Sequence, residues 1–186
     1  MKTFTKHQIE LCRKADRNTQ RLVFDALYSP MFRICQRYLV HTAQTEDCVL
    51  KGMMKMFQQF DSFVFEDETS LFKWIRQIVV NEALMELRKK NNFFLMPEES
   101  FPEIADQQDI LSLMHAEDIN KMILKLPTGY RTVLNLFVVE GYSHKEIAEM
   151  LNIKESTSKT QYMKAKSKLK EMLENYQGEA NGTFGE

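Results

Sequence analysis

The sequence contains little glycine and little proline, with 6 and 4 of these residues in a chain of 186. Folds built from many short strands depend on these residues in their tight turns. Their scarcity therefore argues against an all-β fold. Hydrophobic residues make up 44% of the sequence, which is sufficient for packed cores and excludes a chain that is disordered throughout.

Long hydrophobic runs are also missing. No stretch reaches the roughly 18 apolar residues that a membrane span needs. The N-terminal sequence MKTFTKHQIELCRK lacks the apolar segment of a secretory signal. We therefore expect a cytoplasmic protein that does not insert into a membrane.

Residues that commonly bind metals or perform catalysis are few and scattered. Cys12, Cys35 and Cys48 show no C-x-x-C spacing, so we expect buried free thiols rather than a disulfide or a metal site. The four histidines are also far apart, and neither a glycine-rich phosphate loop nor a nucleophile–base pair is evident. The sequence predicts no enzyme active site, no metal site and no cofactor.

Charge is distributed unevenly along the chain, although the net charge is only −1. Residues 1–95 and 124–170 are basic, whereas residues 96–123 and the C-terminal residues 171–186 are acidic. Two basic modules separated by an acidic connector indicate contact with nucleic acid at two places.

Hydrophobic periodicity predicts an all-α protein with two small helical domains joined by an extended acidic linker. In the first domain, residues 1–95, we expect helices over 6–17 and 19–39, a third from near Thr45, and a fourth capped by Thr69 or Ser70. Residues 96–113 are the linker, because the periodicity is lost there and two prolines occur. Residues 114–176 form the second domain, and residues 177–186 are expected to be a disordered tail.

The second domain carries the pattern of a helix-turn-helix. Pro127 is expected as the first residue (N1) of a helix that runs to about Glu140, where Gly141 ends it. Ser143 and Glu146 form a capping box for a short helix that stops at Asn152, a residue that tolerates the left-handed conformation of a tight turn. A longer basic helix over 156–176 follows. A short helix, a tight turn and a longer basic helix are typical of DNA-binding proteins.

One side of this longer helix has the composition of a surface that reads the major groove. Lysines can bind phosphates or guanine, hydroxyls can bind bases or backbone, and a methionine can contact a thymine methyl group. The alternative is that these residues form only a solvated polar face. The candidate DNA-binding residues here are Ser156, Thr157, Lys159, Thr160, Met163, Lys164 and Ser167.

Two segments resemble the extracytoplasmic-function (ECF) sigma factors, which belong to the sigma-70 family. Residues 126–173 resemble region 4, most closely in Bacteroidetes-type members. The similarity is carried by Leu126-Pro127, Tyr130-Arg131, Gly141-Tyr142-Ser143-His144-Lys145-Glu146-Ile147-Ala148 and Thr157-Ser158-Lys159. Residues 45–90 resemble region 2 of the same family, with TEDCVLKGMMKMF similar to its clamp-binding helix and FKWIRQIVVNEALMELRKK similar to its −10-reading helix.

The resemblance implies a protein that binds core RNA polymerase and directs transcription from specific promoters. Region 2 would dock on the clamp helices and melt the −10 element, and region 4 would sit on the flap and read the −35 element. The acidic linker would thread through the RNA exit path. The family also suggests an anti-sigma factor or a recruiting protein as a partner, and a monomer when free.

The same resemblance assigns the candidate residues of the first domain. The residues expected at −10 DNA are Phe63, Phe65, Trp74, Arg76, Gln77, Asn81 and Arg88. The residues expected at the polymerase are Asp47, Leu50, Lys51, Met54 and Phe57.

Region 2 departs from the family pattern in ways that bear on its DNA contacts. Lys51 reverses a charge expected at the polymerase, and the loop after Phe63 is acidic at Glu66, Asp67 and Glu68. We hypothesise that −10 reading is weakened and that a second protein helps to place this one on DNA. The alternative function is a helix-turn-helix regulator that binds duplex DNA and never joins polymerase.

Overall fold

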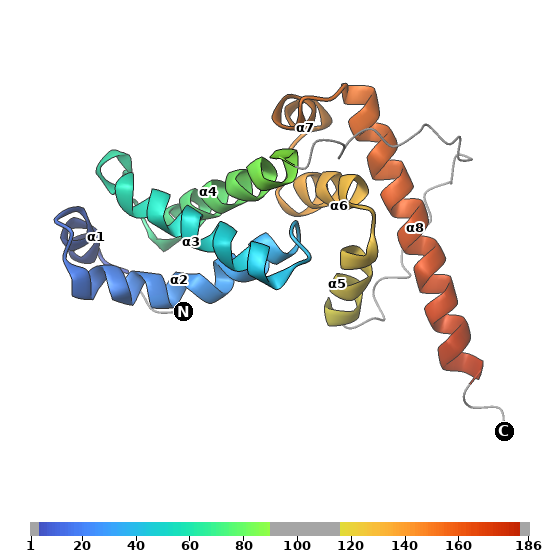
Figure 1. Ribbon diagram of the computed structural model, residues 1–186, viewed down its shortest axis with the longest axis horizontal. Coiled ribbons are helices and arrows are strands. Elements are labelled where there is room, and N and C mark those ends of the chain that lie inside the picture. Colours follow the sequence, from blue (N-terminus) through green and yellow to red (C-terminus); the bar gives the residue numbers. More distant parts are fainter. Residues whose placement is uncertain (1–3, 90–115, 183–186) are drawn as a thin grey trace. The chain divides into compact units, whose positions relative to one another are not determined.

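The structure is a computed structural model that describes residues 4–89 and 116–182 (Figure 1). The predicted linker over 96–113 lies outside the described residues. The chain divides into two compact units, Met1–Asn91 and Asn92–Glu186. The described residues are helical almost throughout and contain no strand, so the predicted all-α fold is confirmed. None of the described helices is long and apolar enough to span a membrane.

The first unit is a small helical bundle. Its elements are α1 (Lys6–Arg13), α2 (Arg17–Gln36), α3 (Thr42–Gln58), the 3₁₀ turn η1 (Phe60–Ser62) and α4 (Glu68–Lys89). Helices α2, α3 and α4 all pack on one another, and α1 packs on α2 (Figure 1). Burial of apolar side chains from each helix stabilises this bundle. The largest fully buried side chains of this unit, which include two that follow α2, are Ile9, Met31, Tyr38, Leu39, Met53, Met56, Phe60, Leu71, Ile75 and Leu84.

Helices α3 and α4 approach each other most closely at Gly52. A Cβ atom placed on Gly52 would lie 2.6 Å from Cγ1 of Val79, so only glycine fits at this crossing. Cys35 and Cys48 lie beside the same crossing, with their sulfur atoms 3.6 Å apart. Both thiols and that of Cys12 are free and buried, as predicted.

The second unit contains five helical elements among its described residues. They are α5 (Ala116–Lys125), α6 (Thr128–Leu134), the π-helical segment η3 (Asn135–Val139), α7 (His144–Leu151) and α8 (Glu155–Gly182). Helix α8 packs against α6 and α7. Leu126, Leu134 and Ala165 form the centre of one apolar cluster, against which Tyr162 and Leu169 pack.

Several helix ends differ from the prediction for local reasons. Helix α1 stops at Arg13 rather than near residue 17, because Ala15 adopts a positive φ of 56°. Helix α3 begins at Thr42, before the predicted Thr45, whose buried hydroxyl instead donates to the carbonyl of Leu39 (2.9 Å). Helix α4 is capped by Asp67, whose carboxylate accepts a hydrogen bond from the backbone N–H of Ser70 (2.7 Å).

The second unit also departs from the expected boundaries. Pro127 is the N-cap of α6 rather than its first residue, and the helix passes into a π-helical turn at Asn135. Helix α8 continues to Gly182, so residues 177–182 are helical and the prediction of a disordered tail is wrong for them. These residues directly continue the long helix α8, and extending an existing helix avoids the cost of nucleating a new one. The rest of the predicted tail, residues 183–186, lies outside the described residues.

Candidate nucleic-acid interface

The helix-turn-helix of the second unit is built from local signals that the sequence displayed. The side-chain oxygen of Ser143 accepts a hydrogen bond from the backbone N–H of Glu146 (3.3 Å). The carboxylate of Glu146 accepts one from the backbone N–H of Ser143 (2.8 Å), and its hydrogen bonds with Ser143 hold the pKa of Glu146 below its usual value. Asn152 adopts the left-handed conformation, with φ 54° and ψ 49°, and lets the chain turn directly into α8. The predicted capping box and turn are confirmed.

Four predicted DNA-binding residues share one exposed stripe at the N-terminal end of α8. Lys159 and Thr160 follow Ser156 by three and four residues, and Met163 follows them by four and three, so all four lie on the same side of the helix. Met163 is 50% exposed, which is unusual for a large apolar side chain. Thr157 and Ser167, also predicted at DNA, are half-buried at the margins of this surface. The residues of the stripe, called the α8 stripe below, are Ser156, Lys159, Thr160 and Met163.

Lys164 does not belong to the α8 stripe. It was predicted to face DNA, but only 9% of the residue is exposed, and it lies on the buried side with Ser158, Gln161 and Ala165. The buried arc of α8 is wider than its apolar residues indicate because the helix packs against both α6 and α7. At Gly129 of α6, an added Cβ would lie 3.0 Å from the side-chain oxygen of Gln161, which shows how closely the two helices approach.

The ammonium group of Lys159 already has an anionic neighbour. It lies 2.6 Å from a carboxylate oxygen of Glu155, one turn earlier in α8. This ion pair lowers the pKa of Glu155. Sequence reasoning missed Glu155, although a spacing of four residues between glutamate and lysine was the signal that could have found it.

Helix α4 of the first unit presents a second exposed stripe. Gln77, Asn81 and Arg88 were predicted at DNA from the resemblance, and the structure places them on one exposed side of this helix. Lys73 and Met85 lie in the same row at spacings of four residues, and both were missed by sequence reasoning. These five residues are called the α4 stripe below. Arg76, also predicted at DNA, is half-buried beside it.

The aromatic residues before α4 form a stacked cluster rather than a free row. The ring of Phe63 stacks on that of Trp74, with ring centroids 4.3 Å apart and planes inclined by 12°. Phe63 was predicted to contact DNA, but it is only 7% exposed and does not offer a free ring face to a base. Trp74 and Phe65 remain half-buried at the edge of the cluster. Phe63 is buried because Trp74 covers its ring and Phe60 packs against its edge.

Local contacts hold the loop that carries these rings. The guanidinium group of Arg13 donates hydrogen bonds to the backbone carbonyls of Phe60 (3.1 Å) and Phe63. Two acidic residues that the sequence placed in this loop have structural partners. Asp67 caps α4, and the carboxylate of Glu68, the first residue of α4, accepts a hydrogen bond from the backbone N–H of Phe4. Sequence reasoning missed Arg13, and no local sequence signal connects it to a loop about 50 residues away.

Helix α3 carries the residues predicted at the polymerase. Asp47, Leu50, Lys51 and Met54 are all exposed on one side of it, and Met54 is 61% exposed. Phe57 is half-buried against Phe60, with ring centroids 5.8 Å apart. We call the four exposed residues the α3 stripe.

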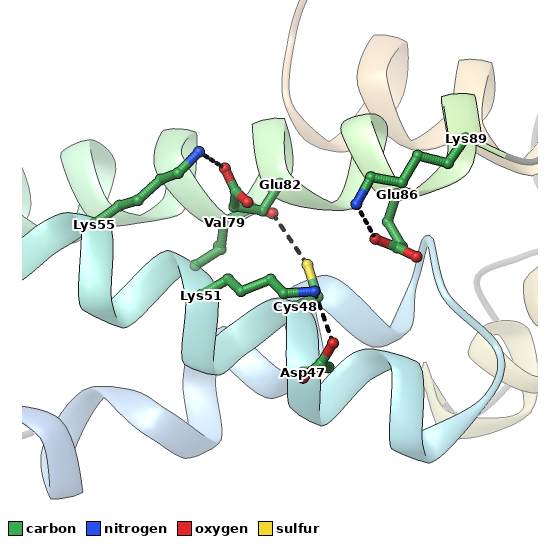
Figure 2. Close-up of polar contacts among 8 residues, drawn as sticks. All are labelled: Asp47, Cys48, Lys51, Lys55, Val79, Glu82, Glu86 and Lys89. Atoms are coloured by element: carbon green, nitrogen blue, oxygen red, sulfur yellow. Dashed lines mark hydrogen bonds and ion pairs between the residues drawn. The ribbon is translucent and has the colours of Figure 1, made fainter.

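Ion pairs line the boundary between α3 and α4, as Figure 2 shows. Lys51 lies 2.7 Å from Asp47 within α3, and Lys89 lies 3.1 Å from Glu86 within α4. Lys55 of α3 pairs with Glu82 of α4. The hydrogen bond to Asp47 raises the pKa of Lys51, so the reversed charge noted in the sequence is offset by a neighbour on its own helix.

Comparisons with known proteins identify the family. The model of Sigma-70 region 2 matches residues 23–93, and that of Sigma-70, region 4 matches residues 116–169. The chain belongs to the ECF group of the sigma-70 family. The Bacteroidetes-type assignment stays a prediction.

Two sequence relatives agree with this assignment. The chain is 27% identical to the ECF RNA polymerase sigma factor SigW of Bacillus subtilis (strain 168), over 93% of this chain and 98% of that protein. It is 26% identical to the ECF RNA polymerase sigma factor SigM of Mycobacterium tuberculosis (strain H37Rv), over 82% of this chain and 78% of that protein. Among solved structures it is similar to the sigma factor RpoE in complex with the anti-sigma factor NepR from Bartonella quintana, with a TM-score of 0.49 and 20% identity over 83% of this chain and 96% of that one.

Proposed function

We propose that this ECF sigma factor binds core RNA polymerase and directs transcription from promoters that it recognises with two separate helices. The observation that carries the proposal is the helix-turn-helix of the second unit, which presents the α8 stripe at the start of its longer helix. A capped short helix followed by a tight turn positions such a stripe for the major groove. The protein contributes binding rather than covalent chemistry, and it acts in the cytoplasm with the polymerase.

The α8 stripe has the chemistry to read the −35 element. In this proposal the ammonium group of Lys159 breaks its ion pair with Glu155 and binds a phosphate or the edge of a guanine. Met163 contacts a thymine methyl group. Ser156 and Thr160 donate or accept hydrogen bonds at bases or phosphates. Lys164 is buried and contributes positive charge behind this surface rather than a contact.

The α4 stripe and the aromatic cluster have the chemistry to read and open the −10 element. Gln77 and Asn81 can hydrogen-bond base edges, and Lys73 and Arg88 can bind phosphates. Trp74 supplies a ring at the edge of the cluster for an unpaired base to stack on. Phe63 supports Trp74 from the buried side, which revises its predicted role.

The α3 stripe is the proposed polymerase surface. Leu50 and Met54 are 44% and 61% exposed, and side chains of this kind commonly bury themselves in a partner. In this proposal α3 docks on the clamp helices, the second unit binds the flap, and residues 96–113 connect the two. The free protein is a monomer, and a regulatory protein, either inhibitory or recruiting, controls its access to promoters.

Capture of genomic DNA by the reconstituted holoenzyme tests this proposal. The full chain is mixed with core polymerase of the source bacterium, the complex is isolated by gel filtration, and bound genomic fragments are sequenced. We expect the fragments to share a motif with an upstream and a downstream part. Replacing Lys159 and Met163 with alanine should erase the upstream part, and replacing Gln77 and Asn81 should erase the downstream part.

A matched variant controls for nonspecific effects of substitution. Glu174 is exposed near the end of the described side chains of α8, and Glu174→Ala should leave both parts of the motif unchanged. Failure of the chain to co-elute with core polymerase would contradict the proposal. So would enrichment of a palindromic motif by the chain without polymerase, because that is the behaviour of a dimeric regulator.

A further inference from the structure

Three aromatic rings from three elements meet at the junction of the helix-turn-helix. The imidazole of His144, the first residue of α7, stacks on the ring of Phe137 from η3, with centroids 4.3 Å apart and planes inclined by 8°. The ring of Tyr162 from α8 lies 4.8 Å from that of Phe137 and 5.7 Å from that of His144. The imidazole is therefore held flat between its own helix, the preceding segment and α8.

One polar contact crosses from this cluster to α8. Nδ1 of His144 lies 2.9 Å from the hydroxyl oxygen of Ser158, which is within hydrogen-bonding distance. Ser158 is fully buried, so its hydroxyl depends on partners within the protein. His144 itself directly follows the Ser143 cap, and the capping box fixes the start of α7.

Ser158 lies on the reverse side of the turn that carries the α8 stripe. Ser156 is two residues before it, and Lys159 and Thr160 directly follow it. A small rotation or slide of α8 at Ser158 would move all of these side chains relative to the base pairs. A hydrogen bond is directional, whereas apolar packing alone tolerates small slides of one helix on another.

We propose that His144 is a positioning residue that sets the register of α8 on the −35 DNA through its hydrogen bond to Ser158. The inference rests on the proposed function, because it concerns how the α8 stripe is aimed. His144 does not touch DNA in this account. Its imidazole combines a flat face for Phe137 with a ring nitrogen for Ser158, and neither phenylalanine nor asparagine supplies both.

The electrostatic surroundings favour the neutral form of this ring. Burial, and then the nearby ammonium group of Lys159, lower the pKa of His144, whereas the carboxylate of Glu155 opposes the effect. A neutral ring can either donate to the Ser158 hydroxyl or accept from it, so the contact is satisfied without a buried charge.

The test selects promoters with holoenzyme made from the full chain. A pool of promoter DNAs randomised over the upstream element is bound by wild-type and variant holoenzymes, and the enriched sequences are compared. His144→Phe keeps a ring on Phe137 but loses the bond, and Ser158→Ala removes the hydroxyl. The double variant leaves an apolar pair with no unpaired buried group. Binding is measured at a temperature at which circular dichroism shows every variant folded.

We expect both single variants and the double variant to lose about tenfold in preference for the wild-type upstream motif, roughly the effect of one base mismatch. His144→Asn, which can still bond Ser158, should recover part of this preference. Leu173→Ala removes a buried side chain elsewhere in α8 and controls for lost stability. It should keep the motif preference, and so should His7→Phe, which changes an exposed residue of α1.

The outcomes separate this inference from the proposed function. If the wild-type holoenzyme selects no upstream motif, the proposed function itself fails. If it selects a motif and either His144→Phe or the double variant selects it equally strongly, the positioning role is wrong. The positioning role is also wrong if Leu173→Ala weakens the preference as much as the His144 and Ser158 variants do.

Discussion

Replacing Gly52 with alanine should destabilise the first unit, although alanine is the better helix former. The exchange would favour a helix interior by about 1 kcal/mol on its own. In this structure, however, the new Cβ would lie 2.6 Å from Cγ1 of Val79. Overpacking of this kind costs about 1–3 kcal/mol, and the neighbouring atom is part of a short branched side chain that cannot swing away. The balance of these two effects is a net loss of up to about 2 kcal/mol.

A second substitution turns this expectation into a sharper test. Val79→Ala removes Cγ1 and should cost about 2 kcal/mol through lost burial and a cavity. In that background a Cβ at position 52 has room, so Gly52→Ala should change from destabilising to neutral or stabilising. The two substitutions are therefore strongly non-additive, as expected for residues in direct contact.

Urea unfolding of the full chain measures both effects. The chain has a single tryptophan, Trp74, and it lies in the first unit, so its fluorescence follows that unit. The reasoning would be refuted if Gly52→Ala stabilised the wild-type background, or if the two substitutions were simply additive. Either result would mean that α3 and α4 do not cross as closely as the structure shows.

Three further predictions concern the stripes and His144. Lys159→Ala should reduce the slope of log affinity against log salt for duplex DNA by about 0.9, the contribution of one phosphate contact, whereas Lys168→Ala should not; titration at several salt concentrations distinguishes them. Exchanging Leu50 and Met54 for serine should weaken binding to core polymerase about tenfold or more without changing the melting temperature, and undiminished binding would place the docking surface elsewhere. The pKa of His144 is lowered in the folded state, so the unfolded chain binds more protons than the folded chain as the pH falls below about 6.5, and the free energy of unfolding should decrease over that window. His144→Phe should flatten this dependence of stability on pH. Equal slopes of stability against pH for the wild-type and variant proteins would contradict the prediction.

Features that depend on a few adjacent residues could be predicted from the sequence. The capping box of Ser143 and Glu146 and the left-handed turn at Asn152 each act within one helical turn, so their residue types are a direct signal. The same holds for the α8 stripe, because residues three and four apart share a side of any helix. These local signals were sufficient to predict the helix-turn-helix.

Features that depend on packing between elements could not be predicted. Lys164 resembles its exposed neighbours in sequence, and only the packing of α8 on α6 and α7 buries it. Phe63 was expected to be available to DNA, but Trp74 covers its ring. The bond between His144 and Ser158 joins residues 14 positions apart, and neither residue type identifies its partner.

Transcription in vitro with core polymerase of the source bacterium tests the central claim most directly. The full chain is added to the core enzyme on genomic DNA, and the 5′ ends of the RNAs are mapped. We predict discrete start sites that are absent with core polymerase alone and that share an upstream motif lost with Lys159→Ala and Met163→Ala. Start sites unchanged from those of core polymerase alone would contradict the claim.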